Sequence, residues 1–138
     1  MARILGIGCG FIAFGGFCLL GLSITAFSTM FSPAADAAES FLADVRHDDY
    51  VSALARMSSA YQANHSAADL QTHVETIHPL RDHGLSFLTS HEVHEDDRVT
   101  VEGSLFGPDG ESPIAFELSE VNGYWYVDLV AVEGTPVE

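Results

Sequence analysis

Residues 41–62, FLADVRHDDYVSALARMSSAYQ, contain two amphipathic patterns on either side of the polar stretch RHDD at residues 46–49. Apolar residues before and after that stretch recur every three or four positions, which is the spacing of one helix face. The first face comprises Ala38, Phe41, Leu42 and Val45, and the second comprises Tyr50, Ala53, Leu54, Met57 and Tyr61. Pro33 suits the start of the first helix, and Asp48 or Asp49 suits the cap of the second. The stretch therefore predicts two short helices joined by a turn.

A third helix is expected to begin at Ser66. Ser66 and Asp69 have the spacing of a capping box, although Glu or Gln is the usual partner of the serine. Proline disfavours helical geometry in the residue before it, so Pro79 is expected to end this helix. Its apolar face comprises Leu70, His73, Val74 and Ile77.

Beyond residue 84 the apolar period changes to two, which is the period of a β-strand. The alternation predicts four strands, over residues 85–94, 98–106, 114–119 and 124–132. The sequence GPDGES at residues 107–112 is a turn by composition, and Asn122-Gly123 predicts a tight hairpin turn. Helices followed by hairpin-linked strands indicate an α+β fold, with two or three short helices packed on one face of a four-stranded antiparallel sheet.

The last predicted strand, YWYVDLVAV, has two distinct faces. One face, which we assign to the core, carries Trp125, Val127, Leu129 and Ala131. The other carries Tyr124, Tyr126 and Asp128, an acid and two phenols that would suit a general base with an oxyanion-stabilising partner. If the tryptophan face is the core face, these three residues point outward. We adopt that interpretation and take Trp125 as the marker of the core.

The N-terminal run from Ile4 to Phe31 is 28 residues long and uncharged. About 20 apolar residues suffice for a helix to cross the hydrocarbon core of a bilayer. We therefore predict a single transmembrane helix, so that residues 1–32 form a membrane anchor in contact with the lipid bilayer through residues 4–31, and residues 33–138 form the α+β domain. A cleaved signal peptide is the alternative, with small residues at Ala35 and Ala37 as the cleavage site.

The distribution of charge predicts the orientation of this anchor. Arg3 is the only charged residue before the apolar run, and all 20 acidic residues follow it. Basic residues favour the cytoplasmic side, so we place the N-terminus in the cytoplasm and the domain outside the inner (plasma) membrane. Both cysteines, Cys9 and Cys18, lie inside the run, which excludes a disulfide scaffold for the domain.

The predicted domain is strongly acidic. It holds four arginines, no lysine and all 20 acidic residues, which give it a net charge of −16. Such a surface repels nucleic acid and anionic lipid headgroups. We therefore predict no nucleic-acid partner and expect a protein partner in the cell envelope.

The helix pair with its FL…DDY..A pattern and the closing strand NGYWYVDLVAV resemble the nuclear transport factor 2-like superfamily over about residues 34–133. A second, weaker likeness is to small anchored assembly factors of respiratory oxidases. The first resemblance implies a cystatin-like cone, in which a curved sheet wraps around the helices. It also suggests a membrane-anchored bacterial member of unknown function. Some members are enzymes resembling ketosteroid isomerase or scytalone dehydratase, with acids, histidines and tyrosines inside the cone. That likeness implies Tyr50, Tyr61, His73 and His91 as candidates for a ligand-binding pocket.

The histidines also allow simpler interpretations. His73 lies on an apolar helix face and His91 shares a strand face with Phe87 and Val93, so both are expected first as half-buried core histidines. In HEVHEDD, residues 91–97, His91 and His94 are an odd number of positions apart and point to opposite faces of a strand. We predict no metal site, no cofactor and no catalytic residue.

Two hypotheses for function follow. The first is a membrane-tethered, non-catalytic interaction or scaffold domain of the cell envelope. The alternative is a small-molecule binding protein or a ketosteroid-isomerase-like enzyme that uses the cone as its pocket. An enzyme requires at least two ionisable groups that converge in a concave and mostly apolar cavity. Few polar residues fall on the predicted inner faces, so the first hypothesis is preferred.

Overall fold

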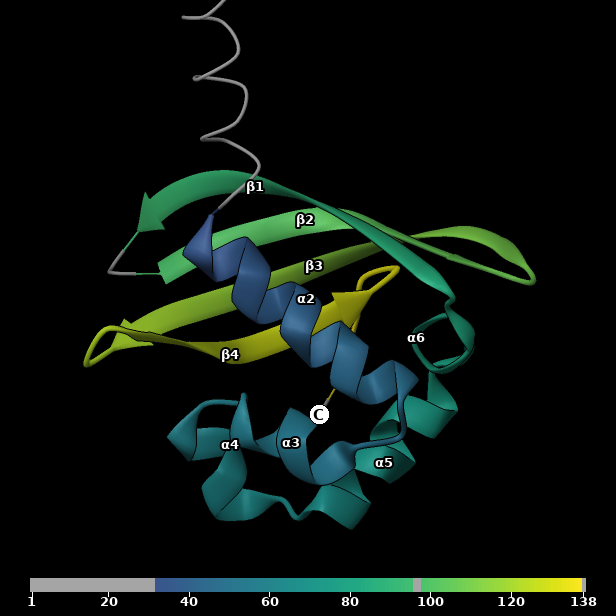
Figure 1. Ribbon diagram of the computed structural model, residues 1–138, viewed down its shortest axis with the longest axis horizontal. Helices are drawn as coiled ribbons and strands as arrows, with labels where there is room; N and C mark the ends of the chain where they lie inside the picture. Colours follow the sequence, from purple (N-terminus) through teal and green to yellow (C-terminus); the bar gives the residue numbers. More distant parts are fainter. Residues whose placement is uncertain (1–31, 96–97, 138) are drawn as a thin grey trace, which may run out of the picture. The chain divides into compact units, whose positions relative to one another are not determined.

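The computed structural model describes residues 32–95 and 98–137, and between residues 89 and 95 it describes the backbone alone. Five helices lie in this part of the chain (Figure 1). They are α2 (Pro33–Arg46), α3 (Tyr50–Ala55), α4 (Ser59–Asn64), α5 (Ala67–Thr76) and α6 (His78–Asp82). The two or three helices expected from the sequence are therefore too few.

The strands of the described residues form one five-stranded antiparallel sheet, in which neighbours in space are also neighbours in sequence. They are β1 (Leu85–Glu95), β2 (Arg98–Gly107), β3 (Gly110–Val121), β4 (Tyr124–Val132) and β5 (Thr135–Pro136). The predicted α+β class and antiparallel sheet are confirmed. The prediction of four strands omitted the two-residue strand β5.

Helix α2 lies across one face of the sheet (Figure 1), and its apolar stripe is buried as predicted. Phe41 packs edge-on against Phe116 of β3, with 6.1 Å between the ring centroids. Alternate residues of β2, β3 and β4 complete this interior, each at most 3% exposed. They are Val99, Val101, Leu105, Ile114, Phe116, Leu118, Val127, Val130 and Val132. We call this side of the sheet the inner face and the opposite side the outer face.

Two predicted helix caps are present. The Asp49 carboxylate accepts a hydrogen bond from the Ser52 backbone amide at 3.1 Å, and hydrogen bonds from Ser52 lower the pKa of Asp49. Ser66 and Asp69 form the predicted capping box, in which each side chain accepts a hydrogen bond from the other's backbone amide. Pro79 follows the end of α5 as expected, but it also lies in the first turn of α6, where its missing amide proton costs nothing.

The second predicted helix is interrupted, and this corrects the sequence analysis. Helix α3 ends at Ala55 and α4 begins at Ser59, so Met57 and Tyr61 do not belong to one helix. Between the helices the backbone pairs with β4: the Ser58 amide donates to the Val127 carbonyl at 2.8 Å, and the Val127 amide donates to the Arg56 carbonyl at 2.8 Å. This parallel bridge covers part of the edge of β4 that does not pair with β3.

Strand β4 contains a bulge that changes its predicted faces. Leu118 is opposite Val127 and Glu117 is opposite Leu129, so Asp128 is the extra residue. Trp125 and Val127 lie on the core side as predicted. Leu129 and Ala131 were wrongly assigned to it, because beyond the bulge Val130 and Val132 are buried instead.

The hairpin turn at Asn122-Gly123 is confirmed, with φ of 53° and 82°. A similar turn at Glu133-Gly134, with φ of 52° and 79°, connects β4 to β5 and was not predicted. The turn expected over residues 107–112 is shorter, because Gly107 and Gly110 are already paired across β2 and β3.

None of the helices in the described ranges is both long enough and apolar enough to cross a membrane. The predicted anchor, residues 4–31, lies outside the described residues. The alternative cleavage site does not, because Ala35 and Ala37 belong to α2.

Candidate functional site

The three pocket candidates whose side chains are described lie on three different helices. Tyr50 is the first residue of α3 and is 7% exposed, and this burial raises its pKa. Tyr61 lies on α4 and His73 on α5. His91 lies on β1, and its side chain is outside the described part of the structure. The structure therefore brings together Tyr61 and His73, and it leaves Tyr50 apart as a core residue.

Tyr61 and His73 belong to a small aromatic cluster at the α4–α5 junction. The Tyr61 hydroxyl and His73 Nδ1 are hydrogen-bonded at 3.3 Å, and the Tyr61 ring stacks on His65 with 4.0 Å between centroids. His65 also contacts His73 edge-on at 5.6 Å. Burial raises the pKa of the Tyr61 phenol. Since α5 packs on α3 and α6, this cluster lies within the helical layer rather than on the sheet.

The inner face of the sheet is filled with apolar side chains. Large residues from both layers meet there, including Phe41 and Leu42 of α2 and Phe116 of β3, all completely buried. Trp125 is half-buried and packs against this core, so it marks the core less fully than expected. Catalysis inside a cone needs a cavity with ionisable groups, whereas these contacts are those of a packed interior.

Among the histidines whose side chains are described, His83 is the buried one, and the sequence did not single it out. It is 4% exposed, and its Nδ1–H donates to the Leu80 carbonyl at 2.6 Å. Its Nε2 is buried without a partner among the described residues, and burial lowers its pKa. Its position between helix α6 and Gly84 carries no periodic signal, so only the tertiary structure reveals it.

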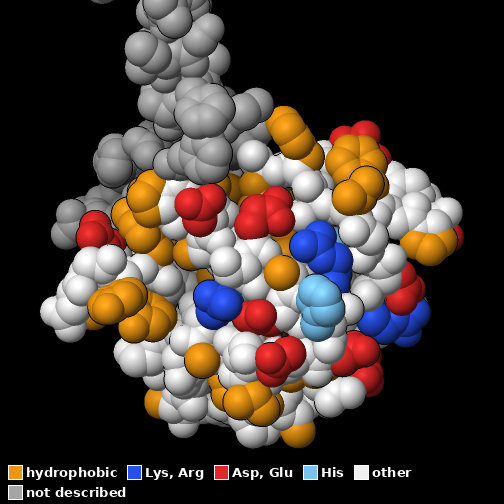
Figure 2. Space-filling model, in the orientation of Figure 1, with side chains coloured by type: hydrophobic (Ala, Val, Ile, Leu, Met, Phe, Trp, Pro, Cys, Tyr) orange, Lys and Arg blue, Asp and Glu red, His pale blue; other side chains and the backbone are white. Residues whose placement is uncertain are grey.

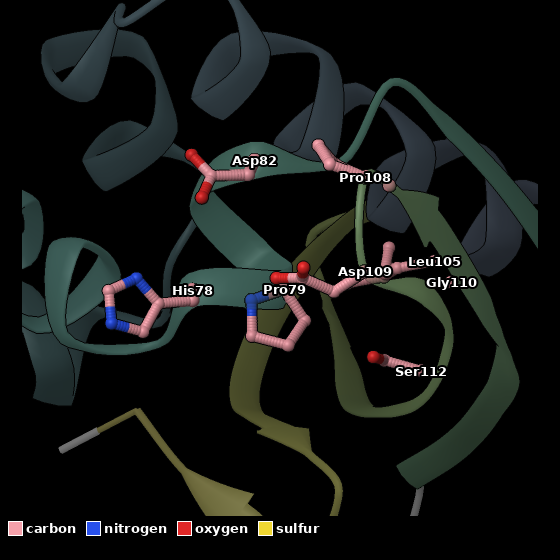
Figure 3. Close-up of a pocket in the computed structure, with 9 residues that line it drawn as sticks. His78, Pro79, Asp82, Leu105, Pro108, Asp109, Gly110 and Ser112 are labelled. Atoms are coloured by element: carbon pink, nitrogen blue, oxygen red, sulfur yellow. The ribbon is translucent and has the colours of Figure 1, made fainter.

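A small cavity lies between α6 and the β2–β3 turn. His78, Pro79 and Asp82 of α6 line one side, and Pro108, Asp109 and Gly110 line the other (Figure 3). The cavity has a volume of 20 Å³, which is enough for roughly one water molecule. Asp82 is engaged with Arg81 at 2.6 Å, and its hydrogen bond with this arginine lowers the pKa of Asp82. This cavity is too small for an organic ligand.

A larger pocket, with a volume of 380 Å³, lies beside the bulge of β4. We call it the bulge pocket. Its lining comes from α4 with the residue before it, from the end of β3 and from β4: Ser58, Ser59, Ala60, Gln62, Ser119, Val121, Tyr126 and Asp128. Tyr126 and Asp128, which the sequence analysis paired and assigned to the outside, therefore do lie together, whereas Tyr124 is 70% exposed and lines a different hollow.

Three large apolar side chains are exposed on the outer face where β1 meets β2. Leu85 is 69% exposed, Phe87 60% and Phe106 41%. Leu85 and Phe106 are directly opposite each other in the sheet, and Phe87 is opposite Ser104 on the same face. We call these residues the outer apolar triplet. The Ser104 hydroxyl donates to Glu111 at 2.6 Å, which gives the triplet a polar border.

Charged side chains of both signs are interspersed over the face that carries α2 (Figure 2). Arg56 pairs with Asp44, and Arg46 donates to the Ser86 hydroxyl, which in turn donates to Glu39. Within the described ranges, metal-ligating side chains do not gather in groups of three. No protein-family model matches the sequence, and no curated protein shows significant similarity to it.

Proposed function

We propose that this chain is a membrane-tethered, non-catalytic interaction domain of the cell envelope, and that the outer apolar triplet contacts its protein partner. The exposure of Leu85, Phe87 and Phe106 on one face is the observation that carries this proposal. Burying such a side chain fully is favourable by about 1.5–3 kcal/mol compared with leaving it in water. Contiguous exposed apolar groups with a polar border are typical of protein contact sites.

The filled inner face supports a non-catalytic role. The alternative function, an enzyme or binding protein that uses the cone, needs space between α2 and the sheet. Phe41 of α2 and Phe116 of β3 occupy that region and are in direct contact. The two tyrosines and His73 that the alternative would use lie in the helical layer or the core.

Membership of the nuclear transport factor 2-like superfamily is part of the proposal. In its support, α2 packs on the inner face of an antiparallel sheet whose strands follow one another in sequence. The attachment to the inner membrane rests on the uncharged run of residues 4–31, and the placement of the domain outside the cytoplasm rests on Arg3.

Site-specific photocrosslinking in cells that express the full chain tests the contact surface. A photoreactive phenylalanine analogue replaces Phe87 of the triplet or, as a matched control, Val51 of α3, which is apolar and 73% exposed. We expect a crosslinked product of discrete mass from position 87 in the membrane fraction and none from position 51. The substitution Phe106→Ser is expected to reduce the product at position 87.

Two outcomes would contradict the proposal. Equal products from positions 87 and 51 would mean that the probe reports random collision rather than a contact surface. A complete absence of product at position 87, with the protein correctly folded and present in the membrane, would mean that the triplet has no protein partner.

A further inference from the structure

The bulge pocket is built around one carboxylate. The bulge leaves Asp128 without a partner residue on β3, so its side chain is positioned differently from those of the regular strand. Asp128 lines the pocket together with the Tyr126 phenol and the Ser119 hydroxyl. Serines 58 and 59 and Gln62 complete the polar lining on the side of α4.

The charge of Asp128 is not neutralised by the described residues. Its Oδ2 is shielded from solvent and has no hydrogen-bond partner there. Arginine is absent from the lining, and the ion pairs recorded for this part of the chain, Arg56–Asp44 and Arg81–Asp82, involve other acids. The carboxylate as a whole is half-buried and lines the pocket, so a cation bound there would supply the counter-charge that it lacks.

The rest of the lining offers hydrogen bonds of both kinds. The Ser58 hydroxyl oxygen accepts from the Tyr61 amide at 3.4 Å, so its proton is available to a ligand. The Gln62 amide nitrogen donates to the Met57 carbonyl at 2.8 Å, which leaves its amide oxygen as an acceptor. A ligand that carries hydroxyl groups would complement these side chains.

We propose that the bulge pocket binds a small hydroxylated primary amine of about the size of an amino sugar. Its ammonium group would pair with the Asp128 carboxylate, and its hydroxyl groups would bond to Ser58, Ser119 and Gln62. The volume of 380 Å³ lies within the range of small-molecule sites. The net charge of −16 beyond residue 31 draws cations toward the domain and disfavours anionic ligands. The site is distinct from the outer apolar triplet, so it does not depend on the proposed function.

Ligand-observed saturation-transfer NMR on the full chain in detergent micelles tests this site. The probe is glucosamine, and glucose, which lacks the ammonium group, is the matched control ligand. We expect saturation transfer to glucosamine and little to glucose. Asp128→Asn should weaken glucosamine binding about tenfold, since it removes the charge from the principal hydrogen bond. Asp109→Asn, which changes the net charge equally in the β2–β3 turn, should leave binding unchanged.

A second variant guards against misfolding of Asp128→Asn. Val121 lines the pocket and is 51% exposed, so Val121→Lys is compatible with the fold and places an ammonium group in the pocket that Asp128 lines. We expect it to compete with glucosamine and to reduce binding as well. Equal loss of binding in Asp109→Asn and Asp128→Asn would show non-specific attraction to an acidic protein and would overturn the proposal. Equal transfer to glucose, or none to glucosamine, would also overturn it.

Discussion

The two faces of the sheet differ in the burial and the polarity of their side chains. On the inner face, alternate residues of β2, β3 and β4 are apolar and completely or almost completely buried. The outer face of the sheet holds polar residues, the outer apolar triplet at β1 and β2, and the bulge pocket at β3 and β4. Phe116 and Phe106 illustrate the contrast, since they lie on neighbouring strands with exposures of 0% and 41%. The inner face therefore stabilises the fold, whereas the two proposed binding surfaces, the outer apolar triplet and the bulge pocket, lie on the outer face.

The largest difference between the faces is expected from phenylalanine truncation. Phe116→Ala removes a buried ring that contacts Phe41, and should cost about 3–5 kcal/mol of unfolding free energy. Phe106→Ala removes a ring from a residue that is 41% exposed, so less buried area is lost, and it should cost about 1 kcal/mol. Urea denaturation of the full chain in detergent, followed by circular dichroism, measures both values. Similar losses would show that the outer face is packed against another part of the protein.

A glycine comparison tests how closely β1 approaches β2. A Cβ atom at Gly103 would clash with the Phe87 carbonyl oxygen, whereas one at Gly84 would meet nothing within 4 Å. Gly103→Ala should therefore force the strands apart and cost about 1–3 kcal/mol. Gly84→Ala, the matched control, should leave stability unchanged or raise it by about 0.4–1 kcal/mol. The prediction fails if both variants melt at the same temperature.

Truncation of Trp125 tests how far the buried core extends along β4. Trp125 is half-buried and packs against the core near the start of β4. Trp125→Ala should cost about 2 kcal/mol, less than a fully buried aromatic residue would. Denaturation followed by circular dichroism gives the value. A loss as large as that of Phe116→Ala would place the indole inside the core, and no loss would place it on the outer face.

The smallest expected effect concerns pH. Burial lowers the pKa of His83 below its usual value near 6.5, while Arg46 also lowers it and Glu39, together with the hydrogen bond to Leu80, opposes the shift. The unfolded chain therefore binds a proton at a higher pH than the folded chain. The stability contributed by neutral His83 is present above about pH 6.5 and is lost as the pH falls below this value.

Melting temperatures at pH 7.5 and 5.5 isolate this contribution when the native chain is compared with His83→Gln. The native chain should lose more stability on acidification than the variant does. His47→Gln, at an exposed histidine, provides the control and should behave like the native chain. An equal pH response of the native chain and His83→Gln would exclude an effect of burial on His83.

Local rules predicted much of this fold. The spacing of Phe41, Leu42 and Val45 identified the buried face of α2, and Ser66 with Asp69 identified the start of α5. Asn122-Gly123 identified the β3–β4 turn. Each of these signals involves residues close together in sequence, where helix periodicity, capping and turn geometry are decided.

The errors arose where distant segments meet. The break between α3 and α4 depends on pairing of residues 56–58 with Val127, and the bulge at Asp128 depends on the register of β4 against β3. The spacing of apolar residues along the chain indicates neither this pairing nor this register. The same limit applies to the sites: Tyr126 and Asp128 were paired by sequence, but the pocket that contains them needs Ser58 and Gln62 from another part of the chain.

The pairing of residues 56–58 with Val127 has a consequence for biosynthesis. Ribosomes make the helical half of the domain first, at about 5–20 residues per second. The junction between α3 and α4 gains its backbone partner only after residue 127 has been added. The Val137 amide then donates to the Val130 carbonyl at 2.9 Å, near the end of the chain. A nascent chain that stalls before residue 127 therefore exposes an unfinished sheet and an unfixed helix junction together, and both become substrates for chaperones and proteases.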